Sequence, residues 1–312
     1  MSLRGGIDLG GTKIQAVILD EDGEVRGQAR RPTPHVGGPA DVIAALAECL
    51  REAARESGLP DAVGVGSPGE IDADSGTVSQ AKNLPDWEGA YALGPALSQA
   101  LEGARVRVGN DVAVAIQAEA ALGAGRPYSS LLGVFWGTGV GGGLILDGKP
   151  WHGRGAAGEI GHTVVKLGGA RCPCGRRGCL EAYAGRAAME AKARRKPGKT
   201  KLFELMEEHG KERLTSGIWE RALDADDKLA VHLIDRAVAA LGAGIASAVN
   251  LLDVQAVVIG GGLGDRLGRP YADRIKHAMM PHLFSDGRPP DVHVSALGDL
   301  GGALGAAMLA SA

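Results

Sequence analysis

The sequence predicts an α/β protein made of two related halves. Apolar, strand-like runs alternate with helical patterns along its 312 residues, an order typical of this fold class. Each half contains a similar hairpin, in which two β-prone runs flank a Gly/Thr turn, at residues 6–20 and again at 131–146. A Leu-Asp pair and a nearby glycine follow the second run in both halves. We interpret this similarity as a weak internal duplication at a domain-sized interval.

The elements of the first half follow from local signals. Asp22-Gly23 predicts a turn after the hairpin. Asp41 resembles a helix cap, and Gly58 and Pro60 would end the helix that it starts. In chain order we expect the hairpin at 6–20, a strand at 24–30, a helix from 41 to about 57, strands at 62–66 and 106–108, and a helix at 111–122.

The second half follows the same alternation. A long, largely apolar helix is expected at 229–251, and the basic stretch 194–201, which contains Pro197 and Gly198, is expected to be a solvated loop between helices. The remaining expected elements are the hairpin at 131–146, buried strands at 254–259 and 292–296, and a small-residue helix at 303–309.

Composition limits the classes of function. The formal charge is −3, so no overall basic field attracts nucleic acid or anionic lipid. A hydrophobic content of 45% supports a large core, and no apolar run of membrane-spanning length is visible. No apolar signal segment opens the chain, and only four cysteines occur. We therefore expect a protein of the reducing cytoplasm.

Three of the four cysteines predict a metal site. Cys172, Cys174 and Cys179 fall within eight positions, and His162 lies ten residues upstream of the first. Three thiolates and one imidazole are the ligands of a closed, structural zinc site. Gly175 and Gly178 allow the tight backbone turns that such spacing needs.

Other interpretations of the cysteines are weaker. Disulfides would suit a secreted protein, which the lack of a signal segment does not favour. Cys49 lies in a helical apolar pattern and is interpreted as a buried small hydrophobe. Zinc is therefore preferred to disulfide bonds at the cluster.

Three glycine-rich turns follow apolar strands, at residues 10–12, 137–139 and 260–262. Their backbone N–H groups can face phosphate oxygens. A single turn of this kind also occurs in ordinary hairpins, but three in one duplicated chain favour a nucleotide. The spacing matches neither a Walker A loop nor a Rossmann fingerprint, so Lys13 has no Walker role.

Two aspartates stand at strand ends near these turns. Asp8 precedes the first turn and could hold Mg²⁺ or merely cap the turn. Asp111 could be a helix N-cap, the commoner role at such a position. Beside phosphate turns, however, a rigidly held carboxylate is a candidate general base for a hydroxyl.

Polar loops predict a sugar pocket. Asn83 and Gly69 lie in loops with polar side chains or exposed backbone, and Glu159 and Glu181 flank the predicted zinc segment. Sugar hydroxyls are recognised by such groups, because a buried polar partner left unpaired is costly. The zinc would then hold the segment that carries both glutamates.

These motifs together resemble the ROK family (repressors, open reading frames, kinases), and within it the bacterial ATP-dependent glucokinases. The likeness covers nearly the whole chain, and the cysteine segment is its most specific part. The motifs that carry it begin at residues 8 (Asp-x-Gly-Gly-Thr-Lys), 66 (Gly-Ser-Pro-Gly), 83 (Asn-Leu-Pro-x-Trp), 110 (Asn-Asp), 137 (Gly-Thr-Gly-x-Gly-Gly-Gly), 159 (Glu-Ile-Gly-His), 172 (Cys-x-Cys-Gly-x-x-Gly-Cys-x-Glu) and 260 (Gly-Gly-Gly).

The resemblance implies an actin-like, hexokinase-like fold of the ribonuclease H type, with a small lobe at 1–122, a large lobe at 123–300 and a last helix, about 301–312, packed on the small lobe. It implies a cleft between the lobes that closes on the substrate, and a homodimer or homotetramer. It also implies transfer of the ATP γ-phosphoryl group, with Mg²⁺, to the 6-hydroxyl of glucose.

The resemblance also implies residue roles. Asp111 matches the general base, and His162, Cys172, Cys174 and Cys179 match the zinc ligands. The residues expected at the sugar are Gly69, Asn83, Asn110, Asp111, Glu159, His162 and Glu181. The residues expected at the nucleotide are Asp8, Gly10, Gly11, Thr12, Lys13, Gly137, Thr138, Gly139, Gly261 and Gly262.

One departure and three alternatives remain. Many members read Asn-Asp-x-Asn where this chain has Ala113, which leaves sugar preference open. The acceptor could be fructose, mannose or an N-acetylhexosamine. The donor could be polyphosphate, although such enzymes typically lack the cysteine cluster. A sugar-sensing repressor is disfavoured, because the first phosphate-turn strand begins at residue 6 and leaves no room for a winged helix.

Overall fold

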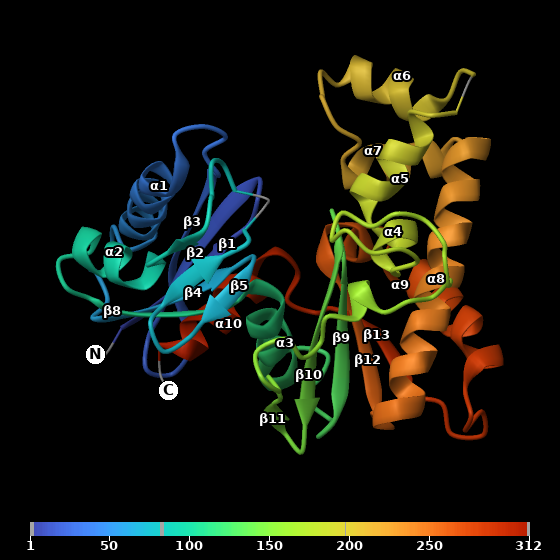
Figure 1. Ribbon diagram of the computed structural model, residues 1–312. Helices are drawn as coiled ribbons and strands as arrows, with labels where there is room; N and C mark the ends of the chain where they lie inside the picture. The colour runs from blue at the N-terminus through green and yellow to red at the C-terminus, as the bar shows by residue number, and fades with distance from the viewer. Residues whose placement is uncertain (1–2, 82–83, 197, 311–312) are drawn as a thin grey trace. The chain divides into compact units, whose positions relative to one another are not determined.

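The computed structural model describes residues 3–81, 84–196 and 198–310. Its contacts divide the chain into two compact units (Figure 1). The first unit comprises Met1–Gly123, Pro150–Ala157 and Asp299–Ala312, and the second comprises Ala124–Lys149 and Gly158–Gly298.

A five-stranded mixed sheet forms the centre of the first unit. In spatial order its strands are β3 (Val25–Pro32), β2 (Lys13–Leu19), β1 (Arg4–Leu9), β4 (Ala62–Ser67) and β8 (Arg105–Asn110). The first three strands pair antiparallel, whereas β1, β4 and β8 run parallel. Strand β4 is buried at every position, as its unbroken apolar and glycine run predicts.

The second unit repeats this arrangement with another five-stranded sheet. Its strands, in spatial order, are β11 (Lys149–Pro150), β10 (Val140–Leu146), β9 (Leu131–Trp136), β12 (Ala256–Gly260) and β13 (Asp291–Val294). Strands β9 and β10 are antiparallel, and β9, β12 and β13 run parallel. The predicted duplication is therefore confirmed: in each sheet a hairpin is followed by two added parallel strands.

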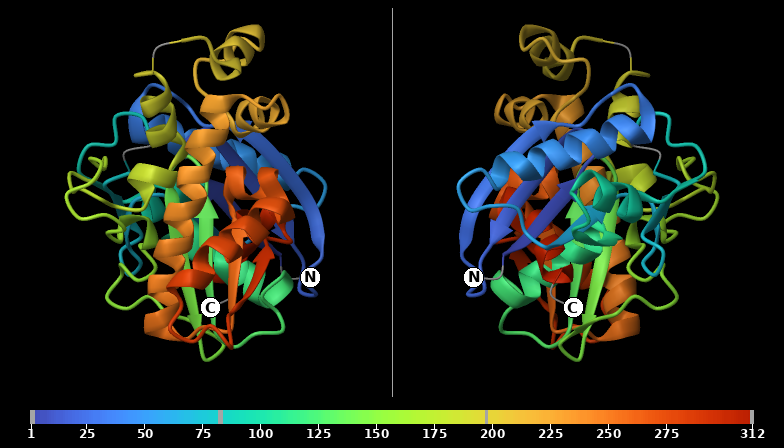
Figure 2. Two further views of the ribbon diagram at one scale, coloured as in Figure 1. Left: turned by 90° about the vertical axis from the view of Figure 1, so that its right-hand side faces the viewer. Right: turned by 90° about the vertical axis from the view of Figure 1, so that its left-hand side faces the viewer.

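The helices of the first unit cover its sheet. They are α1 (Gly38–Ala53), α2 (Leu93–Ala100), α3 (Asp111–Leu122) and α10 (Gly301–Leu309). Helix α1 packs on β2 and β3 (Figure 2), and α10 packs on β1 and β4. Gly6 and Gly64 make that second contact possible, because a Cβ at either position would overlap backbone atoms of α10. A small three-stranded sheet consists of β5 (Glu70–Asp72), β6 (Thr77–Ser79) and β7 (Ala90–Tyr91).

Helix α1 begins earlier than the sequence predicted. Its N-cap is Gly37, at φ 92°, and Pro39 occupies the first turn, where its missing N–H costs nothing. Asp41 lies within the first turn and not at the cap, so that prediction was wrong. The helix also ends at Ala53, four residues short of the expected position.

The second unit contains the remaining helices among the described residues. They are α4 (Glu181–Ala184), α5 (Arg186–Ala193), α6 (Lys201–Glu208), α7 (Ser216–Asp224), α8 (Lys228–Leu252) and α9 (Gly261–Met279), with short 3₁₀ turns at Ile160–His162 and Met280–His282. A further 3₁₀ turn, Gly298–Leu300, begins where the chain returns to the first unit. The basic stretch after Ala193 connects α5 to α6, as predicted.

Helix α8 confirms the expected long apolar helix. Asp227 caps it, accepting hydrogen bonds from the N–H groups of Leu229 and Ala230 at 3.1 and 2.8 Å. By length and composition alone this helix could cross a membrane, but 61% of its most apolar window is buried within the protein. It packs against α9 and α4, which is the behaviour of a core helix.

Candidate active site and metal centre

Three parallel strands of the first unit end at one edge of the sheet. Their register pairs Asp8 of β1 with Gly66 of β4, and Ser67 of β4 with Asn110 of β8. Asp8 and the Asn110-Asp111 pair therefore lie at the same edge, as the sequence motifs predicted. Gly66 contributes by its small size, because a Cβ there would lie 3.3 Å from the Asp111 Cα atom.

The carboxyl group of Asp8 has an unusual environment. Burial and the nearby carboxylates of Asp111 and Asp299, against the opposing charge of Lys13, together raise its pKa to about 7. Both effects disfavour the ionised form. A cation placed between such carboxylates would offset this cost, so the edge is electrostatically suited to a metal ion.

Asn110, and not Asp111, caps helix α3. The Asn110 Oδ1 atom accepts hydrogen bonds from the N–H groups of Val112 and Ala113, each at 3.1 Å. The interpretation of Asp111 as the N-cap is therefore wrong. One Asp111 oxygen accepts from the Val112 N–H at 2.8 Å. This bond and the rigid helix start fix the position of the carboxylate.

The first glycine turn, between β1 and β2, is closed by backbone bonds. The Gly10 N–H donates to the Lys13 carbonyl at 2.9 Å, and the Thr33 hydroxyl donates to the Gly10 carbonyl at 2.6 Å. The Thr33 N–H donates to the Thr12 carbonyl at 3.2 Å. Lys13 forms an ion pair with Asp299 at 2.5 Å, so its charge is already compensated within this unit.

The second glycine turn, between β9 and β10, is held by the start of helix α5. The N–H groups of Arg186 and Ala187 donate to the carbonyls of Gly137 and Thr138, at 3.1 and 3.0 Å. The Arg186 guanidinium also donates to the Thr138 hydroxyl and to the Ser216 hydroxyl, both at 2.8 Å. Sequence reasoning missed Arg186 and Ser216, since they lie 48 and 78 positions from Thr138 (186 − 138 and 216 − 138) and carry no motif.

The third glycine turn joins β12 to helix α9 in the same unit. Gly261 has φ 84°, a conformation that favours glycine, and a Cβ there would lie 2.8 Å from the Trp136 nitrogen. No side chain caps α9. A Cβ on Gly262 would lie 3.5 Å from the Ser216 hydroxyl, at the start of α7. Two helix N-termini thus adjoin, and such ends attract anions.

The four predicted metal ligands lie together. The ligand atoms of His162, Cys172, Cys174 and Cys179 all fall within 4.8 Å of one another. The Cys172 Sγ atom is 3.8 Å from the His162 Nδ1 atom, and the Cys174 and Cys179 sulfurs are 3.7 Å apart. A tetrahedron with Zn–S bonds of about 2.3 Å has edges of about 3.8 Å. The donor set and spacing therefore fit zinc.

The backbone of this segment turns as the glycines predicted. Gly175 and Gly178 both have positive φ, 91° and 84°. The backbone N–H of Arg176, which faces the Cys174 sulfur, lowers the pKa of that thiol to about 7, whereas burial raises the pKa of Cys172 to about 12. Cys49 lies elsewhere, fully buried in the core of the first unit, as predicted.

Both predicted glutamates touch the metal cluster. The His162 Nε2 atom lies 3.9 Å from a Glu159 carboxylate oxygen. One Glu181 oxygen lies 3.9 Å from the Cys172 sulfur, and the other accepts from the Val140 N–H at 3.0 Å. Glu181 therefore connects the cysteine cluster to the hairpin that carries the second glycine turn.

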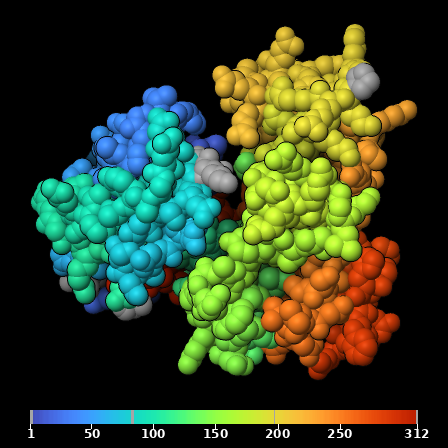
Figure 3. All heavy atoms as spheres, in the orientation of Figure 1, coloured from blue at the N-terminus to red at the C-terminus, as the bar shows by residue number. Residues whose placement is uncertain are grey.

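One further predicted sugar contact, Gly69, lies in the first unit. Gly69 has φ 99° and stands before β5. Asn83 lies outside the residues that the structure describes. The segment that contains the cluster is coloured yellow-green in Figure 3 and reaches the molecular surface. Within this segment, Leu167 has 91% of its surface accessible.

Known proteins resemble this chain over its whole length. A family model described as "ROK family" matches residues 4–312. The Thermotoga maritima glucokinase is 33% identical, over 97% of this chain and 96% of its own length. An N-acetylgalactosamine kinase from Shewanella is 32% identical, over 97% and 95%.

A solved structure agrees with these relatives. The ROK family glucokinase of Streptomyces griseus, in complex with glucose and AMPPNP, is 32% identical, covers 99% of both chains and superposes with a TM-score of 0.85. This likeness confirms the predicted actin-like α/β fold and the interpretation of the chain as an enzyme. The chain belongs to the ROK family.

Proposed function

We propose that this protein is an ATP-dependent glucokinase, which transfers the γ-phosphoryl group of ATP to the 6-hydroxyl of glucose. The observation that carries the proposal is the full-length likeness to the Streptomyces griseus glucokinase bound to glucose and AMPPNP. The edge that carries Asp8 and Asp111 supplies the chemistry that this reaction needs.

Asp111 is the proposed general base. Its carboxylate is fixed at the first residue of α3 by the Asn110 cap. There it accepts the proton of the sugar 6-hydroxyl as that oxygen attacks phosphorus. Asp8 is the proposed Mg²⁺ site, and its proximity to a second carboxylate supports that role. The Mg²⁺ ion would neutralise charge on the phosphates.

The proposed sugar contacts come from the cap and from the metal segment. Asn110 uses its amide oxygen as a cap, which leaves its Nδ2 group to donate to a hydroxyl. Glu159, His162 and Glu181 provide acceptors and a ring nitrogen beside the cluster. Zinc with four protein ligands has no open position, so its proposed role is to hold these side chains still. Gly69 and Asn83 complete the proposed contacts.

The proposed nucleotide contacts are the three glycine turns. Gly10, Gly11, Thr12 and Lys13 form the first, Gly137, Thr138 and Gly139 the second, and Gly261 and Gly262 the third. Their tight hydrogen bonding and the adjoining helix N-termini support phosphate binding in the second unit.

A coupled assay of ADP release over a small sugar panel tests this function. Glucose, fructose, mannose, N-acetylglucosamine and N-acetylgalactosamine should each be offered with ATP and, in parallel, with polyphosphate, for which formation of the sugar phosphate is measured because no ADP is released. We expect the highest kcat/KM with glucose and ATP. A clear preference for an N-acetylhexosamine would instead favour the second candidate, which the likeness to the Shewanella kinase supports. A protein that phosphorylates none of these sugars would contradict both candidate functions.

We also propose a cytoplasmic homodimer or homotetramer. The family resemblance supports the assembly. The cysteine cluster, whose thiols must stay reduced to bind metal, supports the compartment. Light scattering coupled to size-exclusion chromatography measures the assembly directly, and a monomeric mass would contradict it.

A further inference from the structure

The guanidinium of Arg186 is held in place by neutral groups only. It is half-buried at the first position of α5, and it donates to the hydroxyls of Thr138 and Ser216. A guanidinium carries five N–H groups. These two bonds use two of them and leave a planar fork of donors at the second glycine turn.

Among the residues that the structure describes, no carboxylate forms an ion pair with Arg186. The acid whose charge acts on it, Glu190, is 8% exposed and already accepts two bonds from Arg194 and one from the Leu214 N–H. Burial and the neighbouring charge of Arg213 lower the pKa of Arg186, and the charge of Glu190 opposes them. Buried charges in folded proteins are normally paired, so the ligand-free site has a surplus of positive charge.

The surroundings of Arg186 also favour an anion. Ser216, which holds the guanidinium, is the first residue of α7 and lies beside the uncapped N-terminus of α9 at Gly262. Helix N-termini present partial positive charge and free N–H groups. The Arg186 guanidinium and two helix starts therefore lie close to the turn at Thr138, and the carboxylate at this turn, Glu181, accepts from the Val140 N–H at 3.0 Å.

We propose that Arg186 binds the phosphate chain of the nucleotide directly, while Thr138 and Ser216 fix its orientation. The ligand class is a nucleoside di- or triphosphate. This inference rests on the proposed kinase function for the identity of the nucleotide. Arginine is suited to this role because its planar fork matches two phosphate oxygens, a geometry that lysine does not reproduce.

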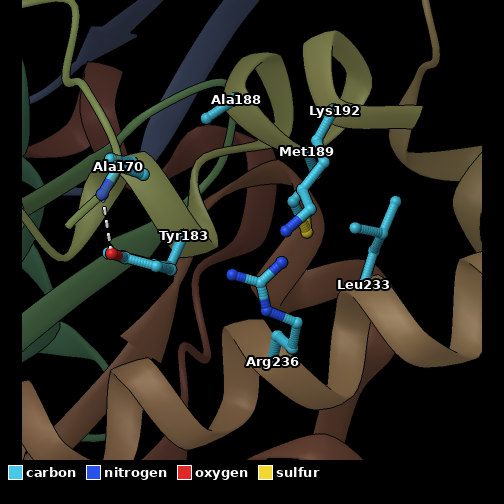
Figure 4. A pocket seen from close by; sticks show the side chains of 8 residues that line it. Ala170, Tyr183, Ala188, Met189, Lys192, Leu233 and Arg236 are labelled. Atoms are coloured by element: carbon cyan, nitrogen blue, oxygen red, sulfur yellow. Dashed lines mark hydrogen bonds between the residues drawn. The ribbon is translucent and has the colours of Figure 1, made fainter. Parts of the chain in front are cut away.

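The chain offers a matched control on the same helix. Lys192 of α5 lines a separate small cavity with Tyr183 and Arg236, and Figure 4 shows these side chains together. Neither Arg186 nor Thr138 lines that cavity. Lys192→Ala therefore removes one positive charge from α5 without touching the proposed phosphate contact.

Calorimetric titration without sugar tests the inference. ATP, ADP, AMP and adenosine are titrated into the wild type, Arg186→Gln, Arg186→Lys and Lys192→Ala. We expect Arg186→Gln to weaken ATP and ADP binding by about 10- to 100-fold, the range of a hydrogen bond to a charged group, and to leave adenosine unchanged. Arg186→Lys should recover part of the loss, and Lys192→Ala should bind all four as the wild type does.

Two outcomes would overturn the inference. Unchanged ATP and ADP affinity in Arg186→Gln would remove the residue from the phosphate site. An equal loss for adenosine would show a purely structural role. Thermal unfolding shows whether Arg186→Gln is folded. If it is not, the affinities of Arg186→Lys for ATP, ADP and adenosine are compared with those of the wild type instead. A wild type that binds ATP through Arg186 but phosphorylates no sugar would contradict only the proposed function.

Discussion

The two hairpin turns occupy equivalent positions in the two sheets, yet different charged groups surround them: three aspartates and Lys13 at the first, and Arg186 and Glu181 at the second. The turn between β1 and β2 lies near Asp8, Asp111 and Asp299. The turn between β9 and β10 is held by Arg186, with Arg213 nearby. A duplicated backbone has therefore acquired two electrostatic environments, one suited to a cation and a proton, the other suited to an anion.

This difference shows that two hairpins can share the same backbone arrangement while the charged side chains around them differ. Both turns are closed by short backbone bonds and follow a buried strand. Asp8 lies on the strand before its turn, whereas Asp111 and Arg186 come from helices farther along the sequence, α3 in one unit and α5 in the other. Loops of equivalent backbone can thus carry different chemistry in the two units.

The largest expected effect is at Asp111. Asp111→Ala removes the proposed base and should lower kcat with glucose by roughly 10²- to 10⁴-fold, while glucose binding, measured by calorimetry, persists. Steady-state kinetics with the coupled assay measures the loss. Near-normal turnover would show that Asp111 is not the general base. The first turn would then have no assigned role in proton transfer to distinguish it from the second.

A smaller loss is expected at Asp8. Asp8→Asn keeps the size of the side chain but weakens its hold on a divalent cation, so kcat/KM should fall by about 10²-fold at fixed Mg²⁺. Raising the Mg²⁺ concentration should recover part of this activity. A Mg²⁺ titration of activity measures both effects. An identical Mg²⁺ dependence in variant and wild type would show that the acidic edge does not serve a cation.

The comparison also shows what the sequence could and could not predict. Local patterns located both hairpins, the cysteine cluster and Asp111, because each depends on residues close together in the chain. The sequence did not predict Arg186 and Ser216, because the hydrogen bonds that link them to each other and to Thr138 join residues far apart in the chain. Such contacts leave no periodic signal in the sequence. The error at Asp41 has a local reason: Gly37 and Pro39 provide an alternative helix start.

The metal centre provides a third test, with a weaker effect on catalysis. Wild-type protein should contain one zinc per chain by elemental analysis. Cys174→Ser should lose it and bind glucose about 10- to 100-fold more weakly, because Glu159, His162 and Glu181 lose their support. Cys49→Ser is the matched control, since this buried cysteine lies in the other unit and should keep the metal. Zinc-free wild type would contradict the assignment.

The smallest effect separates the two roles of Asn110. Its amide oxygen caps α3 at 3.1 Å, whereas its amide nitrogen is the proposed sugar donor. Asn110→Ala should cost about 1 kcal/mol of stability, measured by denaturant unfolding, and should also raise the KM for glucose. Asn110→Asp retains a capping oxygen but has no amide donor, so stability should be kept while the KM still rises. A normal KM for glucose in Asn110→Asp would show that Asn110 only caps α3. The proposed sugar contacts of the first unit would then be the Asp111 carboxylate and the loops around it.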